Sequence, residues 1–250
     1  MLRIGCVKYL NARPLIYGWS GAVDFDHPAA LCRKLEHGDL DVALVSSLEF
    51  LRRPIYRIVD GISISSRGPV YSVVLAHREE LTAVPQIELD PASETSVALL
   101  KCLLAERGLN PRLVLRHRHS TDVTAQLLIG DQAIQFRQKH SDYRFWDLGE
   151  GWKNVINLPF VFALWLIRPE IHNAKEIADA LRQVRDHNLK NLDDLAPTQS
   201  EVSLAFCRKY YREHLFFDFG EGEKAGLREF HRRCLLNKIE VAPDLRLNLV

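Results

Sequence analysis

The chain carries almost no net charge and no long apolar run. Its 33 lysines and arginines are balanced by 32 aspartates and glutamates, so that its 250 residues have a formal charge of +1. This balance leaves no basic excess of the kind that favours nucleic acid. No apolar run approaches the ~20 residues that a helix needs to cross a bilayer. We therefore expect neither nucleic acid nor a membrane as a partner.

Cysteine is also scarce. The five cysteines are scattered, odd in number and never spaced as Cys-x-x-Cys: Cys6, Cys32, Cys102, Cys207 and Cys234. This pattern favours reduced, mostly buried thiols over a disulfide framework or a structural zinc site. The sequence opens with Met1-Leu2-Arg3-Ile4-Gly5, without the apolar core of a signal peptide. We expect a cytoplasmic protein, and the missing export signal argues against a role in transport.

Several common catalytic motifs are absent. The sequence has no Gly-x-Ser-x-Gly elbow, no Gly-x-Gly-x-x-Gly loop and no Gly-x-x-x-x-Gly-Lys loop, which argues against covalent hydrolysis and nucleotide chemistry. His117 and His119 are spaced to share one face of a strand, but arginines flank them and no third metal ligand lies at a recognised spacing. We expect no metal and no cofactor. His119 or Arg118 could instead meet an anionic ligand.

The sequence does contain strand patterns that alternate with helical ones. With 47% hydrophobic residues, it can bury a substantial core. Apolar and β-branched runs predict strands over 2–7, 41–45, 56–64, 70–77, 84–89, 113–115, 126–129 and 161–167. Helical spacing predicts helices over 28–37, 95–107, 175–187, 198–214 and 223–236. Gly38 ends the first of these helices, and Thr198 with Glu201 forms a capping box for the fourth. The alternation predicts a largely parallel sheet covered by helices, in one domain or in two lobes.

The segment Tyr9-Leu10-Asn11 is the first candidate for a functional site. It follows the first predicted strand, and Pro14 biases Arg13 away from helical geometry. In open α/β sheets, side chains beyond the carboxyl end of a strand are well placed to touch a ligand. Asn11 is therefore a candidate ligand contact, and the alternative is that it caps the helix that follows.

The corner 90–96 is the second candidate, because a strand ends and a helix begins there. Amide groups in the first turn of a helix have no intrahelical acceptor, and the helix dipole adds positive potential. Thr95 and Ser96 could therefore hold a carboxylate without any lysine or arginine. The alternative is a plain helix cap, made by Ser93 or Thr95.

Two further corners combine glycine with polar side chains. In Arg67-Gly68-Pro69, glycine permits a close backbone approach, and Ser65, Ser66 and Ser72 offer hydroxyls around the turn. The alternative for this segment is an ordinary hairpin turn. At Gly130-Asp131 the chain can turn sharply after a strand, and Asp131 could orient a ligand hydroxyl or cap the next helix.

Six motifs in a fixed order cover the chain from its start to about residue 168. They are Tyr-Leu-Asn-Ala-Arg-Pro-Leu at 9–15, Gly-Asp-Leu-Asp-Val-Ala-Leu-Val at 38–45, Ser-Arg-Gly-Pro-Val-Tyr-Ser-Val at 66–73, Thr-Ser-Val-Ala-Leu-Leu at 95–100, Leu-Ile-Gly-Asp-Gln-Ala at 128–133 and Leu-Pro-Phe-Val-Phe-Ala-Leu-Trp at 158–165. Together they resemble the chorismate dehydratases of the futalosine route to menaquinone. One departure is Thr-Ala-Gln at 124–126, where the family has Asp-Ala-Ala, which affects the approach to the fifth motif rather than the motif itself.

The resemblance implies an α/β fold of the type II periplasmic-binding-protein kind, in which each of two lobes is a mixed, mostly parallel sheet flanked by helices. It places lobe 1 at 1–76 plus 160–250, lobe 2 at 77–159, and the ligand cleft between them. The implied substrate-binding residues are Tyr9, Ser46, Ser66, Gly68, Pro69, Val70, Ser72, Thr95, Ser96, Gly130 and Asp131, with Asn11 as the catalytic residue.

The implied activity is that of a hydro-lyase. It eliminates water from chorismate, a small dicarboxylate, to give 3-[(1-carboxyvinyl)oxy]benzoate. Few strong bases stand in the matched motifs, which suggests that a substrate carboxylate takes the proton. The alternative function is that of a non-catalytic binding protein or sensor for an aromatic carboxylate. The oligomeric state is left open.

Overall fold

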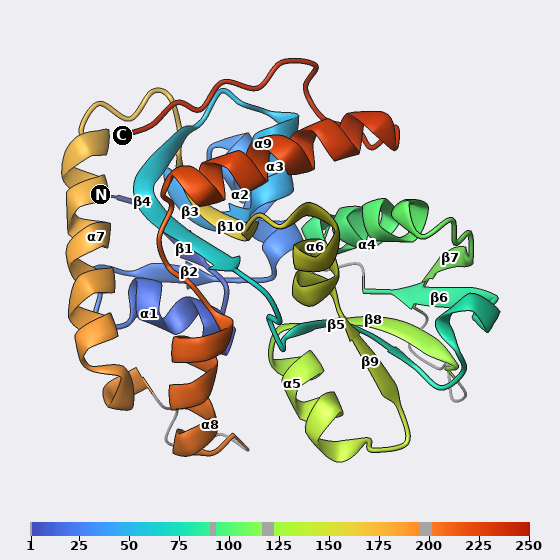
Figure 1. Cartoon of the computed structure of the whole chain (residues 1–250). Helices are drawn as coiled ribbons and strands as arrows, with labels where there is room; N and C mark the ends of the chain where they lie inside the picture. Colours follow the sequence, from blue (N-terminus) through green and yellow to red (C-terminus); the bar gives the residue numbers. More distant parts are fainter. Residues whose placement is uncertain (1, 91–93, 117–122, 196–201) are drawn as a thin grey trace.

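The structure is a computed structural model that describes residues 2–90, 94–116, 123–195 and 202–250. Its strands form two five-stranded sheets (Figure 1). The strand order in the first sheet is β2 (Val23–Phe25), β1 (Ile4–Cys6), β3 (Val42–Ser46), β10 (Phe160–Ile167) and β4 (Arg57–Ser66). The second sheet has the order β7 (Arg112–Leu115), β6 (Gln86–Leu89), β8 (Ala125–Ile129), β5 (Val73–His77) and β9 (Arg144–Asp147). All eight predicted strands are present within a few residues of their predicted bounds, and β2 and β9 were not predicted.

Each sheet is mixed, as the resemblance implies. Strand β1 runs parallel to β2 and β3, and β6 runs parallel to β7 and β8. Strands β5 and β10, which carry the chain into the second sheet and back into the first, run antiparallel to both of their neighbours. Parallel and antiparallel pairings are therefore equal in number, so the sheets are less parallel than the sequence predicts. The lobe boundaries at 76/77 and 159/160 stay a prediction, and the first of them falls at the end of β5.

Helices cover both sheets. They are α1 (Arg13–Ile16), α2 (Pro28–His37), α3 (Ser47–Arg52), α4 (Glu94–Glu106), α5 (Gly130–Lys139), α6 (Leu148–Ile156), α7 (Ala174–Lys190), α8 (Leu204–Lys209) and α9 (Glu221–Leu236). On the first sheet, α7 packs against β4 and α9 against β10. On the second sheet, α6 and α5 cover opposite faces (Figure 1). Four of the five predicted helices are confirmed, three of them with small shifts at their ends.

Helix α2 shows how local signals set an element. Pro28 occupies the first turn, where its missing N–H costs nothing, and Leu31 and Leu35 are buried against the sheet. Gly38 then takes the left-handed conformation with φ +80°, and its N–H reaches back to the carbonyl oxygens of the last turn. The helix therefore spans the residues that the sequence predicts.

The predicted helix 198–214 begins later than expected. Helix α8 starts at Leu204, and the Ser203 hydroxyl accepts a hydrogen bond from the Phe206 N–H at 3.2 Å. The predicted capping residues Thr198 and Glu201 lie outside the described residues. After α8 the chain continues as a π-helical turn over Tyr210–His214.

The segment between β4 and β5 corrects another expectation. An ordinary hairpin turn at 67–69 would pair β4 with β5, but the two strands lie in different sheets. The hairpin alternative is therefore wrong, because β4 pairs with β10 and β5 pairs with β8 and β9. The segment instead carries the chain from one sheet to the other.

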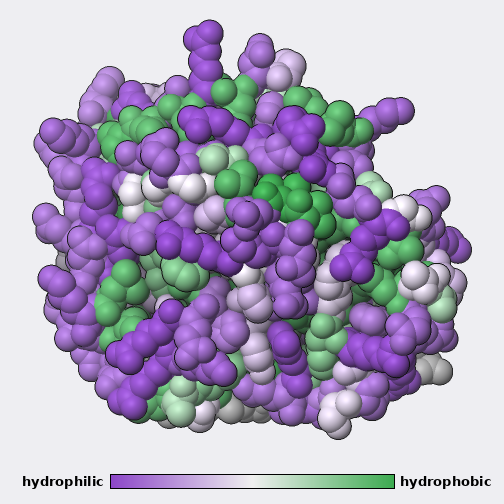
Figure 2. Space-filling view, viewed as in Figure 1, coloured by the Kyte–Doolittle hydropathy of each residue, from purple (hydrophilic) through white to green (hydrophobic). Residues whose placement is uncertain are grey.

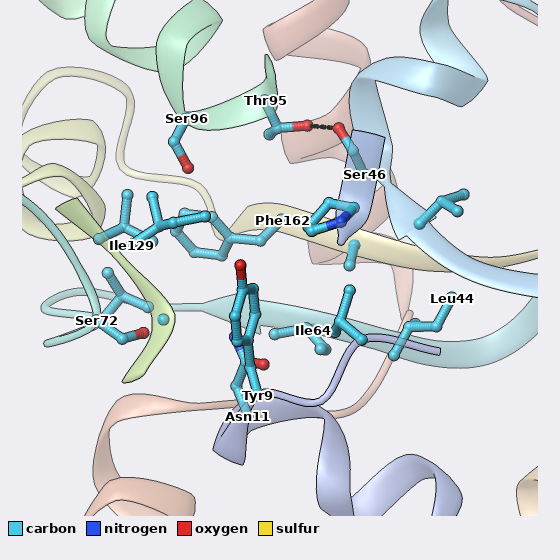
Figure 3. A pocket seen from close by; sticks show the side chains of 17 residues that line it. Tyr9, Asn11, Leu44, Ser46, Ile64, Ser72, Thr95, Ser96, Ile129 and Phe162 are labelled. Carbon is cyan, nitrogen blue, oxygen red and sulfur yellow. Dashed lines mark hydrogen bonds between the residues drawn. The ribbon is translucent and has the colours of Figure 1, made fainter. Parts of the chain in front are cut away.

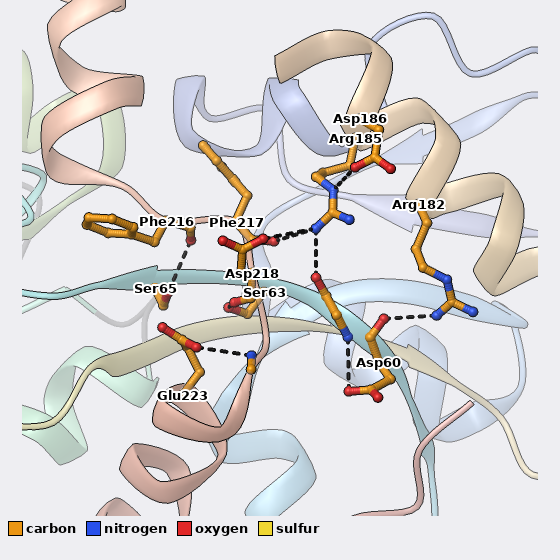
Figure 4. Close-up of polar contacts among 12 residues, drawn as sticks. Asp60, Ser63, Ser65, Arg182, Arg185, Asp186, Phe216, Phe217, Asp218 and Glu223 are labelled. Atoms are coloured by element: carbon orange, nitrogen blue, oxygen red, sulfur yellow. Dashed lines mark hydrogen bonds and ion pairs between the residues drawn. The ribbon is translucent and has the colours of Figure 1, made fainter. Parts of the chain in front are cut away.

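Strand β4 forms an edge of the first sheet, and later parts of the chain cover it (Figure 4). Ser65 and Phe216 exchange two backbone hydrogen bonds, each of 2.9 Å. The guanidinium groups of Arg182 and Arg185 on α7 donate to the carbonyl oxygens of Asp60 at 2.9 Å and Gly61 at 2.7 Å. An unpaired edge invites pairing with another chain, and this covering reduces that exposure.

Polar and charged side chains cover most of the face shown in Figure 2, with apolar side chains gathered in patches between them. All five cysteines are buried and none is in a disulfide, as the sequence predicts. No helix among the described residues is both long and apolar enough to span a bilayer.

Candidate active site

A pocket lies between the two sheets, at the ends of several strands (Figure 3). Its space free of protein atoms is about 620 Å³ when the open solvent at its mouth is included, and the centres of water-sized molecules can occupy about 70 Å³ of it. Its lining comes from both sheets and comprises Val7, Tyr9, Asn11, Pro28, Leu44, Val45, Ser46, Ile64, Val70, Ser72, Val73, Thr95, Ser96, Ile129, Gly130, Phe162 and Ala163. Tyr9 is the one ionisable side chain among these lining residues, so no lysine, arginine or carboxylate lines the described pocket.

Tyr9 and Asn11 enter the pocket from the loop after β1. Burial, and then the negative charges of Asp90 and Asp131, raise the pKa of Tyr9 to about 12, so its phenol is neutral at physiological pH. Figure 3 shows the Tyr9 hydroxyl pointing into the pocket, with Ser96 on the opposite side. The phenol can therefore donate a hydrogen bond but cannot act as a ready base.

Asn11 does not cap a helix. The residue at the N-cap of α1 is Ala12, and no side chain accepts a hydrogen bond from the first turn. The Oδ1 atom of Asn11 is buried and has no hydrogen-bond partner among the described residues. A buried acceptor without a partner is rare in folded proteins, and here it belongs to a residue that lines the pocket. The helix-cap alternative for Asn11 is therefore wrong.

Thr95 and Ser96 lie in the first turn of α4, as the sequence predicts. The Thr95 hydroxyl bonds to the Ser46 hydroxyl and accepts the Leu48 N–H at 3.1 Å. Leu48 is in the first turn of α3, so Thr95 caps a helix on the first sheet rather than its own. The pair Ser46–Thr95 thereby joins the two sheets across one end of the pocket. Ser93, the other predicted cap, lies outside the described residues.

The corner Gly130-Asp131 meets the loop after β1. Gly130 has φ +56°, and a Cβ at this position would lie 3.1 Å from the Tyr9 ring. The Asp131 carboxylate accepts the Leu10 N–H at 2.9 Å instead of capping its own helix. Burial raises the pKa of Asp131. This corner is thus a second place where the two sheets touch.

Ser72 closes the pocket on a third side. Its hydroxyl accepts a hydrogen bond from the Tyr210 hydroxyl at 2.6 Å, and its carbonyl oxygen accepts the Gly130 N–H at 2.8 Å. Tyr210 belongs to a cluster of aromatic side chains that includes Phe206 and Tyr211. Its ring stacks on Phe206 at 5.7 Å, and its hydroxyl also fixes a residue of the pocket.

The predicted site residues fall into two groups. Eight of them line the pocket: Tyr9, Asn11, Ser46, Val70, Ser72, Thr95, Ser96 and Gly130. Ser66, Gly68, Pro69 and Asp131 do not line it. Ser66 and Gly68 instead pack so closely on Gly149 of α6 that a Cβ there would lie 2.6 Å from the Ser66 Oγ and 2.5 Å from the Gly68 carbonyl oxygen. Contact of any of the twelve residues with substrate stays a prediction.

Sequence reasoning missed the apolar part of the lining. Leu44, Ile64, Ile129 and Phe162 line the pocket together with smaller apolar residues. They have the sequence pattern of buried strand residues. This pattern does not distinguish a residue of the core from a residue of an apolar pocket wall. Three of them, Leu44, Ile129 and Phe162, lie within the family motifs, and this was the available signal.

No group of three or more histidine, cysteine, aspartate or glutamate side chains suited to a metal ion occurs within the described ranges. His117 and His119 lie outside those ranges.

Comparison with known proteins agrees with this architecture. Residues 2–235 match the protein family described as "Menaquinone biosynthesis". The chain belongs to this family. A chorismate dehydratase of Thermus thermophilus is 31% identical over 91% of this chain and 93% of that protein. A chorismate dehydratase of Campylobacter jejuni is 26% identical over 90% of each chain.

Solved structures support the fold. The protein AF1704 from Archaeoglobus fulgidus superposes with a TM-score of 0.69 at 18% identity, covering 95% of this chain and 98% of that one. The alkanesulfonate-binding protein SsuA from Xanthomonas axonopodis pv. citri gives a TM-score of 0.68 at 13% identity, covering 96% and 94%. At these identities the likeness shows the fold alone. The two-lobed periplasmic-binding-protein-like fold predicted from sequence is confirmed.

Proposed function

We propose that this chain is a chorismate dehydratase that eliminates water from chorismate to give 3-[(1-carboxyvinyl)oxy]benzoate, a step of menaquinone biosynthesis. Membership of the menaquinone-biosynthesis family and the similarity to two chorismate dehydratases support this activity. The structural observation that carries the proposal is the start of two helices of the second sheet, α4 and α5, at one pocket.

Two helix N-termini suit a dicarboxylate. Amide groups in the first turn lack intrahelical acceptors, and the helix dipole adds positive potential. A carboxylate near Thr95 and Ser96 would be held by α4, and a second carboxylate would be held by the amides that follow Gly130 in the first turn of α5, since the Gly130 N–H itself is donated to Ser72. Because no lysine or arginine lines the described pocket, these amides are its main source of positive potential.

The apolar wall has a different task. Leu44, Ile64 and Phe162 would contact the carbon ring of the substrate and exclude water. The product ring is aromatic, so elimination is strongly favoured overall, and the enzyme mainly has to fix geometry and assist the leaving hydroxyl.

Asn11 is the residue placed to assist that departure. Its unpaired amide oxygen can accept from the substrate hydroxyl, and its NH₂ group can donate to the oxygen as the C–O bond breaks. Tyr9 stays protonated and supplies a further donor. With no ready base in the described lining, a carboxylate of the substrate itself takes the proton from the ring carbon, and the proton and the hydroxide leave as water.

The class of substrate and the cellular compartment are also part of the proposal. The substrate is a small molecule, and we place the enzyme in the cytoplasm because its five thiols are buried and unpaired, as in a reducing compartment.

The test is incubation of purified protein with chorismate. We expect the diene absorption to be replaced by that of a substituted benzoate, with one product formed per chorismate consumed, as followed by ultraviolet spectroscopy and mass spectrometry. Binding of chorismate without conversion would contradict the activity and favour a binding protein or sensor for an aromatic carboxylate.

A further inference from the structure

Asp147 is a buried carboxylate that neither the motifs nor the pocket lining include. It is 2% exposed and stands at the N-cap of α6, where it accepts the N–H groups of Gly149 at 3.0 Å and Glu150 at 3.2 Å. That much is ordinary helix capping. The same carboxylate also accepts the N–H groups of Val70 at 2.9 Å and Tyr71 at 2.7 Å, far away in the sequence. One side chain thus ties the start of α6 to the segment that crosses between the sheets.

The crossing segment is strained at that point. Tyr71 has φ +67°, a backbone conformation that non-glycine residues rarely adopt. The Ser72 N–H donates to the Val70 carbonyl oxygen at 2.8 Å, so residues 70–72 form a three-residue turn centred on Tyr71. A strained turn of this kind persists only where the surroundings hold it, and such turns cluster at functional sites.

The surroundings of Tyr71 explain how the turn is held. Its N–H donates to Asp147, and its ring contacts Phe206, at a centroid distance of 5.0 Å, and the Arg137 guanidinium, at 4.3 Å. Arg137 also lies 3.5 Å from the Asp147 carboxylate. The cation therefore neutralises the buried charge and covers the ring of the strained residue at the same time.

The two residues flanking Tyr71 belong to the pocket. Val70 and Ser72 both line it, and Ser72 bonds to Tyr210 and Gly130. If the turn relaxed to negative φ, the backbone of Val70 and Ser72 would shift, and this part of the wall would move away from its contacts. A displacement of about 1 Å in a positioning group can cost ~10²-fold in rate.

We propose that Asp147 is a positioning residue for the reaction. Through its hydrogen bonds to Val70 and Tyr71 it holds the strained turn, and the turn sets the wall formed by Val70 and Ser72 against the substrate. Asp147 does not touch the substrate. The inference rests on the proposed dehydratase function, because its readout is turnover of chorismate.

The principal test is Asp147→Asn. This change keeps the size of the side chain but replaces one accepting oxygen by an NH₂ group, which faces backbone donors. We expect kcat/KM for chorismate to fall about 10²-fold, measured per folded protein after circular dichroism and calorimetry.

A matched control is Asp41→Asn. Asp41 is 9% exposed and accepts the Arg3 N–H at 2.8 Å together with the Arg3 guanidinium, but it precedes β3 at the end away from the pocket. We expect this variant to lose stability and to keep kcat/KM within twofold of the wild type.

A rescue experiment separates positioning from plain stability. Glycine adopts positive φ without strain, so Tyr71→Gly removes the need for Asp147 to hold the turn. We expect Asp147→Asn with Tyr71→Gly to recover kcat/KM at least tenfold over Asp147→Asn. This double variant also serves if the single variant does not fold.

Three outcomes bear on the inference. Asp147→Asn with kcat/KM within twofold of the wild type overturns it, and so does a double variant that regains stability but not turnover. A wild-type protein that does not convert chorismate refutes the proposed function instead. The positioning of the wall is then judged by the calorimetric affinity of the same variants for chorismate, where an unchanged affinity of Asp147→Asn overturns the inference.

Discussion

The two walls of the pocket are built differently. The wall from the first sheet carries the large apolar side chains Leu44, Ile64 and Phe162, with Tyr9 and Asn11 projecting from the loop after β1. The wall from the second sheet brings together the starts of α4 and α5 and the small polar side chains of Ser72, Thr95 and Ser96, beside the apolar Val73 and Ile129. Apolar side chains contact a ring, whereas free amide groups bind carboxylates. We therefore assign the departure of the substrate hydroxyl group to the first wall and the binding of the substrate carboxylates to the second.

The largest effect is expected on the first wall, from Asn11→Asp. The change is nearly isosteric but removes a donor and adds a negative charge beside a dianion. Loss of one donor aimed at transition-state charge typically costs ~10²–10³ in turnover, and we expect kcat for chorismate to fall in that range. The thermal midpoint should change little, because Asn11 caps no helix.

Asn173→Asp provides the matched control for this change. Asn173 is exposed, makes no side-chain cap at the start of α7 and is not among the pocket residues. Its replacement adds the same charge and should leave turnover unchanged. Turnover near the wild-type value in Asn11→Asp would remove the catalytic role from the first wall.

The next effect is expected on the second wall, from Thr95→Val. The side chain keeps its size but loses the hydroxyl that bonds to Ser46 and to the Leu48 N–H. We expect chorismate affinity to weaken by about 1–3 kcal/mol, the scale of one hydrogen bond to a charged group, because the bridge that positions the start of α4 for a carboxylate is lost. Isothermal titration calorimetry measures this directly.

Thr95→Ser retains the hydroxyl and should bind chorismate nearly as well as the wild type. If Thr95→Val kept full affinity, the hydroxyl bridge between the walls would have no part in binding.

A third change tests the contact between the walls. Gly130→Ala introduces a Cβ at φ +56° and 3.1 Å from the Tyr9 ring. A non-glycine residue in this conformation costs about 1–2 kcal/mol, which should lower the free energy of unfolding. The ring of Tyr9 must also shift, so KM for chorismate should rise.

Gly108→Ala isolates the loss of stability from the change in KM. Gly108 has φ +64°, and a Cβ added there would meet no atom within 4 Å. This variant should be less stable than the wild type and have an unchanged KM. Equal KM values for the two variants would mean that the contact between Tyr9 and Gly130 does not shape the pocket.

The smallest effect is expected from Asp131→Asn. Burial raises the pKa of Asp131 above its value in the unfolded chain, so ionisation at neutral pH disfavours the folded state. The protonated carboxyl contributes fully to the free energy of unfolding below the unfolded pKa of about 3.9. This contribution is lost as the pH rises through the pKa of the folded chain. Asparagine keeps an oxygen for the Leu10 N–H without the charge.

We therefore expect Asp131→Asn to raise the thermal midpoint at pH 7 by about 2–4 °C at most, the equivalent of ~1 kcal/mol in a chain of this size. The difference from the wild type should shrink as the pH falls to about 4, near the unfolded pKa. A lower midpoint at pH 7 would show that the charged hydrogen bond to Leu10 stabilises the folded chain by more than desolvation costs.

The contrast between the walls also describes what the sequence could predict. The polar wall could be predicted from the sequence, because Thr95, Ser96 and Gly130 follow strands and combine turn or cap residues with a recognisable motif. The apolar wall could not be predicted, because Leu44 and Ile64 have the pattern of buried strand residues. Asp147 was missed because its partners Val70 and Tyr71 are distant in sequence and only the fold brings them together.

The same division holds for the fold. Helix α2 was predicted at its observed bounds, because proline, an apolar face and glycine all act locally. The helices α1, α3, α5 and α6 and the strands β2 and β9 were missed, since short elements carry weak periodicity and owe their stability to tertiary packing. The antiparallel direction of β5 and β10 follows from the two crossings between sheets, which no local pattern encodes.

The place of β10 in the first sheet sets the order in which the chain can assemble during synthesis. Strand β10 lies between β3 and β4, yet it is made only after all strands of the second sheet. The second sheet is one continuous stretch of chain and can form while the protein is still being translated, since domains fold as units as they emerge from the ribosome. The first sheet must wait, with β3 and β4 lacking their common partner. A chain that stops before Phe160 would therefore expose two open strand edges, and premature termination there should yield an aggregating fragment rather than a stable half-enzyme.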